Sequence, residues 1–294
     1  MNKKITELKN SLSSTLDTMT TTQIVELINS EDSKISLVIK ELIPRIIPLI
    51  EEIVININNG GRLIYVGSGT SGRLGVLDAS ECPPTFSVNK NLVIGIISGG
   101  KKALYNSIEG AEDDLNLAIK DISKYKINKK DTIIGITTSG TTPYVHQFLK
   151  ESKKIGSFTS IITANKINKK TYIDKKIECI VGPEILTGST RMKAGTATKM
   201  ILNIISTTTM IKLNKVYQNF MVDLKINNKK LTNRAIKIVS EITDLNKQNS
   251  QELIENANGN VKNAILMYLK NKTYTQSCEI LKKNNDNLRK SLNQ

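Results

Sequence analysis

The sequence contains no tryptophan, and aromatic side chains make up only 4% of its 294 residues. Proteins that bind single-stranded nucleic acids stack the bases on aromatic side chains, so this composition offers few such platforms. The formal net charge is nevertheless +15, from 42 basic and 27 acidic side chains. These basic residues form no long consecutive block. We therefore expect no nucleic-acid partner, and most of the lysines are expected to form a solvated surface that also attracts anionic substrates.

Long uninterrupted apolar runs are also absent. The two longest apolar stretches, 42–57 and 200–211, both contain charged or polar residues, which excludes a membrane-spanning helix in either. The first seven residues lack the hydrophobic region of a signal peptide. The three cysteines are widely spaced, so they form neither a disulfide framework nor a CxxC metal site. We expect a cytoplasmic protein with no membrane partner.

Helical patterns at both ends of the chain flank a central region. Residues 1–59 form a predicted helical segment, in which Pro44 and Pro48 imply a kink or two shorter helices. The glycine pair at 60–61 ends this segment. Residues 235–294 form a predicted small, basic module of three helices. The length of the chain is ample for a hydrophobic core in one large domain or two modest ones.

The central region, residues 60–230, alternates short apolar strands with helical patterns. The predicted strands share an apolar composition and cover residues 63–66, 92–97, 132–137, 157–163 and 179–181. This alternation predicts an α/β fold, a three-layer sandwich in which helices cover both faces of a central parallel sheet. In such sheets ligands bind beyond the carboxyl ends of the strands, where this chain has loops rich in glycine, serine and threonine.

Two of these loops combine glycine with hydroxyl side chains. The loop at 67–73 matches GxGxxG, but the acidic residue that would hold a dinucleotide ribose is missing from the next strand end. Its hydroxyls and backbone N–H groups instead favour a phosphate ester, and the loop at 137–143 repeats the pattern. The alternative is that each loop only caps a helix. The candidate binding residues at these two helix starts are Ser68, Gly69, Thr70, Ser71, Ser139, Gly140, Thr141 and Thr142.

Carboxylates follow the first two strands. Glu81 comes shortly after the first loop, and the proline pair at 83–84 is expected to end its helix. Glu112 belongs to an acidic cluster at 109–114, on a helix predicted over 103–123. Carboxylates from two such units can face each other across a pocket as general acid and general base. On spacing alone, a solvated helix face explains the acidic cluster better.

A third candidate segment begins a long helix predicted over residues 188–215. Ser189, Arg191 and Lys193 lie in its first turns. Basic side chains at this end oppose the helix dipole, so they indicate a bound anion or an acidic partner. The alternative to anion binding is a salt bridge to Glu184 or to a neighbouring subunit.

Several long motifs resemble those of the N-acetylmuramic acid 6-phosphate etherase family. They are the runs at residues 64–86, 109–113, 187–196 and 219–223. The resemblance spans almost the whole chain. It implies a sugar isomerase (SIS) domain with a flavodoxin-like, doubly wound sheet, and a C-terminal module similar to ubiquitin-associated (UBA) folds. It also implies a homodimer in bacterial cell-wall recycling that uses no metal or organic cofactor.

The reaction of that family splits the ether between a sugar phosphate and D-lactate. The resemblance implies that Glu81 protonates the lactate oxygen and that Glu112 is the second catalytic glutamate. The two hydroxyl loops would hold phosphate and sugar hydroxyls, and Arg191 and Lys193 would meet the lactate carboxylate or the phosphate. Thr141 departs from the family pattern, because relatives commonly have an arginine there, so any substrate affinity supplied by that arginine must come from another residue in this chain.

Two other functions are compatible with the same fold. An aldose–ketose phosphosugar isomerase also removes a C2 proton but needs no acid for an ether oxygen at C3. A non-catalytic sugar-phosphate sensor would need neither glutamate. The presence of both Glu81 and Glu112 favours the etherase.

Overall fold

The computed structural model describes residues 4–224, 226 and 228–294. They form two compact units, one comprising residues up to 80 together with 90–206, the other 81–89 and 207–294. The domain boundaries expected from the sequence, at 59–60 and 230–235, stay predictions. Residues 1–3, at the start of the predicted helical segment, and residues 225 and 227, near the second boundary, lie outside the described residues.

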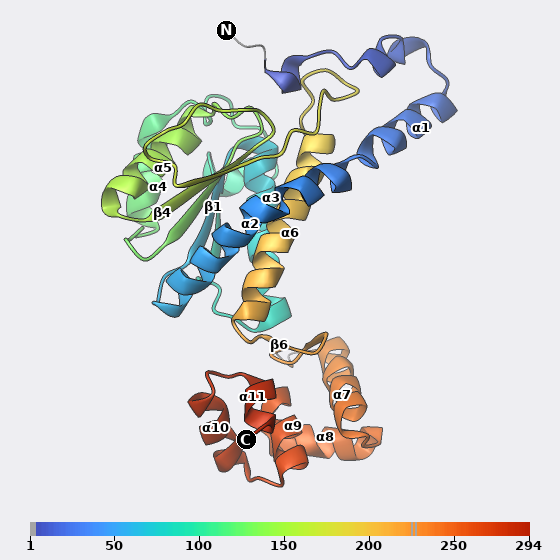
Figure 1. Cartoon of the computed structure of the whole chain (residues 1–294), viewed down its shortest axis with the longest axis vertical. Helices are drawn as coiled ribbons and strands as arrows, with labels where there is room; N and C mark the ends of the chain where they lie inside the picture. Colours follow the sequence, from blue (N-terminus) through green and yellow to red (C-terminus); the bar gives the residue numbers. More distant parts are fainter. Residues whose placement is uncertain (1–3, 225, 227) are drawn as a thin grey trace. The chain divides into compact units, whose positions relative to one another are not determined.

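A parallel sheet forms the centre of the first unit (Figure 1). Its strands lie in the order β2–β1–β3–β4–β5, and all neighbouring pairs are parallel. This is the doubly wound order of flavodoxin-like folds, which confirms the predicted fold class. The strands are β1 (Leu63–Gly67), β2 (Val93–Ile97), β3 (Thr132–Ile136), β4 (Phe158–Thr163) and β5 (Lys175–Glu178).

The position predicted for the fifth strand is wrong. The apolar run at 179–181 follows β5 rather than forming it, and β4 pairs with residues 175–178. β5 is an edge strand in which Ile177 is buried while Lys175 and Lys176 are exposed. A strand covered on only part of its surface lacks the continuous apolar composition that identifies the inner strands of a parallel sheet.

Helices cover both faces of the sheet, as Figure 1 shows. On one face, α4 (Leu115–Lys124) and α5 (Pro143–Ile155) pack on the apolar side chains of β1–β4. On the other face lie α2 (Ile35–Asn58), α3 (Gly69–Phe86) and α6 (Lys193–Lys212). A Cβ atom on Gly95 would lie 2.4 Å from the Cα of Val76, so α3 approaches β2 as closely as glycine allows.

Prolines interrupt the helices less than the sequence suggests. The expected end of α3 directly after Glu81 is wrong, because the helix continues to Phe86 and the Ser87 N–H donates to the Pro83 carbonyl (3.0 Å). Pro83 and Pro84 lie in the last turn, where only the hydrogen bonds of their own missing N–H groups are lost. Likewise, α2 is one helix that contains both of its prolines.

The N-terminal segment approaches the sheet through short 3₁₀ turns before the first α-helix. The turns are η1 (Ile5–Glu7), η2 (Ser11–Ser13) and η3 (Leu16–Thr18). Helix α1 (Thr21–Asp32) then begins with a capping box, in which the Thr20 side chain accepts from Gln23 N–H and Gln23 accepts from Thr20 N–H. Thr20 is therefore the N-cap of α1.

The second unit is mainly helical. A β-hairpin of β6 (Val216–Tyr217) and β7 (Phe220–Met221) precedes its helices. Helices α8, α9 and α10 lie within the predicted three-helix module, while α7 and the short α11 extend it beyond three helices. The helices are α7 (Lys229–Thr243), α8 (Lys247–Asn256), α9 (Val261–Lys270), α10 (Tyr274–Lys283) and α11 (Leu288–Leu292).

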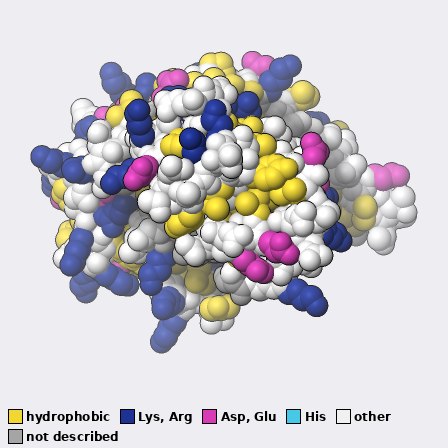
Figure 2. Space-filling view, turned by 90° about the horizontal axis from the view of Figure 1, so that it is seen from below, with side chains coloured by type: hydrophobic (Ala, Val, Ile, Leu, Met, Phe, Trp, Pro, Cys, Tyr) yellow, Lys and Arg dark blue, Asp and Glu magenta, His cyan; other side chains and the backbone are white. Residues whose placement is uncertain are grey.

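On the visible face of the molecule (Figure 2), basic side chains are spread out instead of being gathered in one patch. Figure 2 shows one face of the molecule, on which Lys and Arg side chains stand apart among uncharged ones. Within the described residues, every helix is too short or too polar to cross a membrane.

Candidate active site

The first hydroxyl loop is a tight connection between β1 and α3. A Cβ atom on Gly72 would lie 2.7 Å from the Gly67 carbonyl oxygen, so glycine lets the start of α3 approach the end of β1. Gly69 has a φ of +53°. Thr70 and Ser71 consequently lie in the first turn of α3. The GxGxxG spacing thus serves a close strand–helix turn of the kind that exposes backbone N–H groups to an anion.

Ser98, directly after β2, joins this loop. Its N–H donates to the Gly67 carbonyl (3.0 Å), and its Oγ donates to Ser68 Oγ (2.8 Å). Ser98 is buried and stands where a dinucleotide fold would place an acidic residue. In the sequence this position only excludes a dinucleotide, and no motif marks Ser98 as a site residue.

The second loop contains a chain of hydroxyl groups. Thr137 Oγ1 lies 2.7 Å from Thr142 Oγ1 and 3.3 Å from Ser139 Oγ, which in turn lies 3.1 Å from Thr141 Oγ1. Pro143 is the first residue of α5, as expected. The two loops also meet, because Ser71 Oγ is 3.3 Å from the Thr138 hydroxyl.

A cavity of about 340 Å³ adjoins the first loop. It brings together three of the predicted site residues, Ser68, Gly69 and Glu112. The other lining residues are Arg73, Ser98, Ser107, Ile108, Glu109 and Gly110. Polar loop residues and two carboxylates, those of Glu109 and Glu112, therefore share one cavity in the first unit, which is the combination expected of a site for proton transfer on a polar substrate.

Glu112 does not lie on a helix, so that expectation is wrong. Helix α4 begins only at Leu115, where Asp114 accepts from the Leu117 N–H (2.9 Å) and caps it. The preceding residues form turns, and Gly110 has a φ of +73°. The carbonyl of Glu112 accepts from Tyr144 N–H (2.9 Å), so the backbone is held while the side chain is exposed at the cavity.

Arg73 adds a positive charge to the cavity. Its Nε donates to the Leu104 carbonyl (3.1 Å) and an Nη donates to the Asn106 carbonyl (3.2 Å). These bonds hold the guanidinium against the chain that leads to Glu112. Arg73 belongs to the motif at 64–86 but is not among the site residues predicted from the sequence.

Glu81 is exposed on the part of α3 that belongs to the second unit. The expected pairing of Glu81 with Glu112 across one pocket stays a prediction. The same holds for the roles of the other predicted site residues.

Helix α6 begins later than predicted, because Ser189 and Arg191 lie in turns before Lys193. Glu184 determines this start by accepting from the N–H groups of Lys193 (3.0 Å) and Ala194 (2.9 Å). Burial raises the pKa of Glu184, and the two N–H bonds partly oppose this shift. Arg191 is exposed.

Lys193 has an acidic partner, but its side chain pairs with Glu31 rather than with Glu184. Both side chains of the pair are buried, and Asn10 Nδ2 (2.9 Å) and Lys34 also donate to the Glu31 carboxylate. Burial alone would raise the pKa of Glu31, but the hydrogen bonds from Lys193 and Lys34 outweigh it and lower the pKa. Substrate binding by Lys193 stays a prediction.

The start of α6 lies next to the first loop. A Cβ atom on Gly195 would be 3.8 Å from Thr70 Cγ2. The motif at 187–196 therefore reaches the same edge of the sheet as the first loop, although more than a hundred residues separate them in the sequence.

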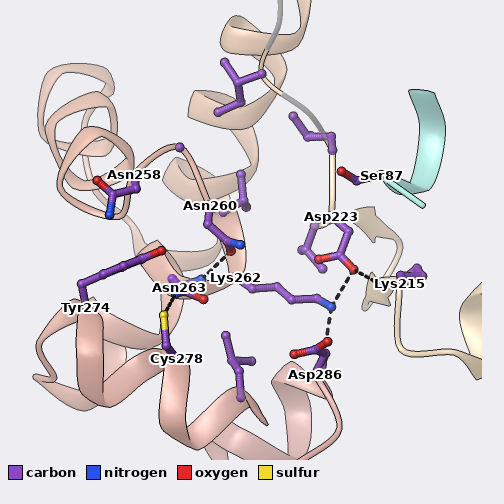
Figure 3. Close-up of a pocket in the computed structure, with 16 residues that line it drawn as sticks. Ser87, Lys215, Asp223, Asn258, Asn260, Lys262, Asn263, Tyr274, Cys278 and Asp286 are labelled. Carbon is purple, nitrogen blue, oxygen red and sulfur yellow. Dashed lines mark hydrogen bonds and ion pairs between the residues drawn. The ribbon is translucent and has the colours of Figure 1, made fainter. Parts of the chain in front are cut away.

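A larger cavity, about 680 Å³, lies in the second unit (Figure 3). Lys262 extends into it and donates to Asp223 Oδ2 (2.8 Å) and to the carbonyls of Asn214 (2.8 Å) and Asp286 (2.9 Å). Burial lowers the pKa of Lys262, and Asp223 opposes this shift. All three ammonium hydrogens are thus used to join separate segments, which gives Lys262 a structural role. Of the etherase-like motifs, only the run at 219–223 contributes to this cavity.

Comparison with known proteins identifies the family. The chain is 48% identical to the N-acetylmuramic acid 6-phosphate etherase of Histophilus somni, over 98% of this chain and 95% of that one. It is 47% identical to the enzyme of the same name from a Geobacillus species, over 98% of each chain. The chain belongs to the N-acetylmuramic acid 6-phosphate etherase family. The family expected from the motifs is therefore confirmed.

Two domain families match parts of this etherase-family chain. The N-terminal SIS domain of glucokinase regulatory protein matches residues 45–153, and the C-terminal lid domain of that protein matches residues 218–285. Among solved structures, a phosphoheptose isomerase from Francisella tularensis has a TM-score of 0.50 and 14% identity, over 66% of this chain and 100% of that one. At that identity the likeness concerns the fold alone.

Proposed function

We propose that this protein cleaves the D-lactyl ether of N-acetylmuramic acid 6-phosphate and releases N-acetylglucosamine 6-phosphate and D-lactate. The supporting observation is a cavity that joins a hydroxyl loop to Glu112, in a chain 48% identical to an etherase over almost its full length. The protein would work in amino-sugar recycling in the cytoplasm.

The chemistry requires two proton transfers. An ether oxygen is a poor leaving group, so lactate leaves C3 only when electron density builds at C2. The open-chain aldehyde at C1 acidifies the C2 proton, which a carboxylate removes, and the C2–C3 double bond forms as the C3–O bond breaks. A carboxylic acid protonates the departing oxygen, and water then adds at C3 of the unsaturated aldehyde. One proton donor and one proton acceptor supply both transfers.

Glu112 and Glu81 are the residues to which we assign these transfers. Glu112 lines the cavity and its side chain is exposed there, so it can exchange a proton with a bound sugar. Glu81 would protonate the lactate oxygen. The hydroxyls of both loops would hold phosphate and sugar hydroxyls, and exposed Arg191 would meet an anionic group of the substrate.

We also propose that two copies of the chain form the working enzyme. Helix α2 carries exposed apolar side chains at Ile43, Ile47 and Ile55, at intervals of four and eight residues that form one stripe along the helix. An exposed apolar stripe is typical of an interface. Light scattering on the purified protein tests this; a molecular mass equal to one chain at micromolar concentration would contradict it.

A sugar-phosphate sensor is the second candidate, because both matching domain families are named after a regulatory protein. A sensor would bind N-acetylglucosamine 6-phosphate and would release no lactate. An isomerase would convert an aldose phosphate into a ketose phosphate, which needs no ether at C3. Product analysis therefore separates the three functions.

The decisive experiment incubates the pure protein with N-acetylmuramic acid 6-phosphate and measures D-lactate. Glu112→Gln keeps the shape of the side chain but cannot exchange a proton, so we expect lactate release to fall by about 10²-fold or more. Asp113→Asn is the matched control, because Asp113 is an exposed neighbour outside the cavity lining. Folded wild-type protein that releases no lactate would refute the etherase function. Full activity in Glu112→Gln would refute the assignment of Glu112.

A further inference from the structure

The N-terminal strap, defined here as residues 4–10, lies against the loops that carry the predicted site. Asn165, which is 3% exposed, accepts from Ile5 N–H (2.7 Å) and donates to Thr6 Oγ1 (3.0 Å). The same amide donates to the Thr138 carbonyl in the second loop (2.9 Å). One buried side chain thus attaches the strap directly to the hydroxyl loop.

The strap also approaches the loop before α6, as Figure 1 shows. Asn10 Nδ2 donates to the Pro183 carbonyl (3.3 Å), and a Cβ atom on Gly188 would lie 3.5 Å from Glu7 Oε2. Both ends of the strap are therefore attached to the first unit. This places its first described residue, Lys4, at a defined position.

Lys4 brings a cation to the second loop. Its Nζ donates to Thr141 Oγ1 (2.7 Å), and Thr141 is exposed. Thr141 is the outermost member of the hydroxyl chain that also contains Ser139, Thr137 and Thr142. These hydroxyls are neutral, and in the described part of the chain Lys4 is the cationic side chain that hydrogen-bonds to them.

We propose that Lys4 is a binding residue for the phosphate group of the substrate. This inference rests on the proposed function only in that the substrate is a sugar phosphate. Several hydroxyl donors and one ammonium group at one loop suit a phosphate, which carries up to two charges and accepts several hydrogen bonds. An anion that reaches Thr141 accepts a hydrogen bond from Lys4 in place of, or together with, the threonine hydroxyl.

A purely structural role for Lys4 predicts something different. If its bond to Thr141 only fixes the strap, removing the charge changes stability or dynamics but does not discriminate between ligands. If it binds phosphate, the loss is specific to ligands that carry phosphate and becomes smaller as salt screens the charge. The lactyl carboxylate is the other anionic group of the substrate. The test therefore needs one ligand that carries only the phosphate and one that carries only the carboxylate.

The test compares Lys4→Met with Lys9→Met, which removes the same charge from an exposed position of the same strap. Isothermal titration calorimetry measures the binding affinity for two ligands. N-acetylglucosamine 6-phosphate has the phosphate alone, and N-acetylmuramic acid has the carboxylate alone. We expect Lys4→Met to lower the affinity for the phosphate ligand about tenfold, which is the usual effect of losing a charge-assisted hydrogen bond. Binding of N-acetylmuramic acid should stay unchanged, Lys9→Met should match the wild type, and Lys4→Arg should restore most of the affinity.

Equal affinity of Lys4→Met and Lys9→Met for the phosphate ligand would overturn the proposal. Weaker binding of N-acetylmuramic acid alone would also overturn it, because Lys4 would then meet the carboxylate. Thermal melting of both variants checks that the strap change has not unfolded the protein. The binding readout requires no turnover. A wild type that binds the phosphate ligand but releases no lactate therefore refutes the etherase function, and leaves the role of Lys4 to be decided by the variants.

Discussion

Neutralising Glu31 is expected to destabilise the first unit strongly, although Glu31 is not one of the predicted catalytic residues. Glu31 is 4% exposed and Lys193 is 3% exposed, so their ion pair is shielded from water. The pair joins the end of α1 to the first residue of α6. Lys34 also contacts Glu31, but its own side chain is 55% exposed and can return to solvent.

The size of the loss in stability depends on which charge is left unpaired. Glu31→Gln leaves the Lys193 ammonium buried without a carboxylate, and breaking a buried pair in this way costs about 3–5 kcal/mol. The amide oxygen of glutamine still accepts one hydrogen bond, so we expect the lower end of that range and a melting temperature lower by about 6 °C. Lys193→Met should cost less, about 1–2 kcal/mol, because Glu31 keeps Asn10 and Lys34 as donors.

Thermal unfolding followed by far-ultraviolet circular dichroism measures these differences, since the chain has no tryptophan to report on folding. The double variant Glu31→Gln/Lys193→Met should be more stable than Glu31→Gln alone, because it no longer buries an unpaired cation. Lys34→Met is the control for an exposed ion pair and should cost less than about 1 kcal/mol. A melting temperature of Glu31→Gln equal to that of the Lys34→Met control would refute this reasoning.

Three further results are expected. The pKa of Glu31 lies below its ordinary value of 4.5. The stability advantage of the wild type over Glu31→Gln is therefore full above pH 4.5 and disappears as the pH falls through that lowered pKa, which thermal unfolding at a series of pH values measures. Gly72→Ala forces a Cβ within 2.7 Å of the carbonyl that ends β1 and should lower stability by about 1–3 kcal/mol in the same assay, whereas Gly195→Ala, whose Cβ has 3.5 Å of space, should not. Ser98→Ala removes the hydroxyl bond to Ser68 and should raise KM for the sugar phosphate by about three- to tenfold with little loss of stability.

The sheet was predictable because its inner strands are identified by local composition. β1 and β3 are buried at every position and β4 at all but its first, their sequences are rich in isoleucine and other apolar residues, and the parallel arrangement follows from the helices between them. The prediction failed where contacts between residues far apart in the sequence determine the local structure. The edge strand β5 exposes two consecutive lysines and buries only Ile177, and residues 105–114 form turns because Gly110 and the Asp114 cap compete with helix formation.

The candidate site could be predicted only in part for the same reason. The hydroxyl loops are encoded by local spacing, which identifies Ser68, whereas Glu112 is identified only through the family resemblance. The structure places both residues at one cavity. Ser98 carries no motif of its own and is recognised only from its bond to Ser68. Lys4 reaches the second loop through Asn165, which is 160 residues away from Ile5 in the sequence, and no local pattern contains that contact.

Lys193 shows how far a local rule extends. A basic residue at the start of a helix opposes the dipole, which correctly indicated that an opposite charge must be nearby. The rule does not say where that charge comes from, and the nearest candidate in the sequence, Glu184, instead accepts from the backbone of α6. The side chain pairs with Glu31, 162 residues earlier. The charge of Lys193 is therefore already balanced inside the protein, which makes exposed Arg191 the better candidate of the two for an anionic substrate. Arg191→Met should accordingly raise KM without lowering the melting temperature, whereas Lys193→Met should lower the melting temperature.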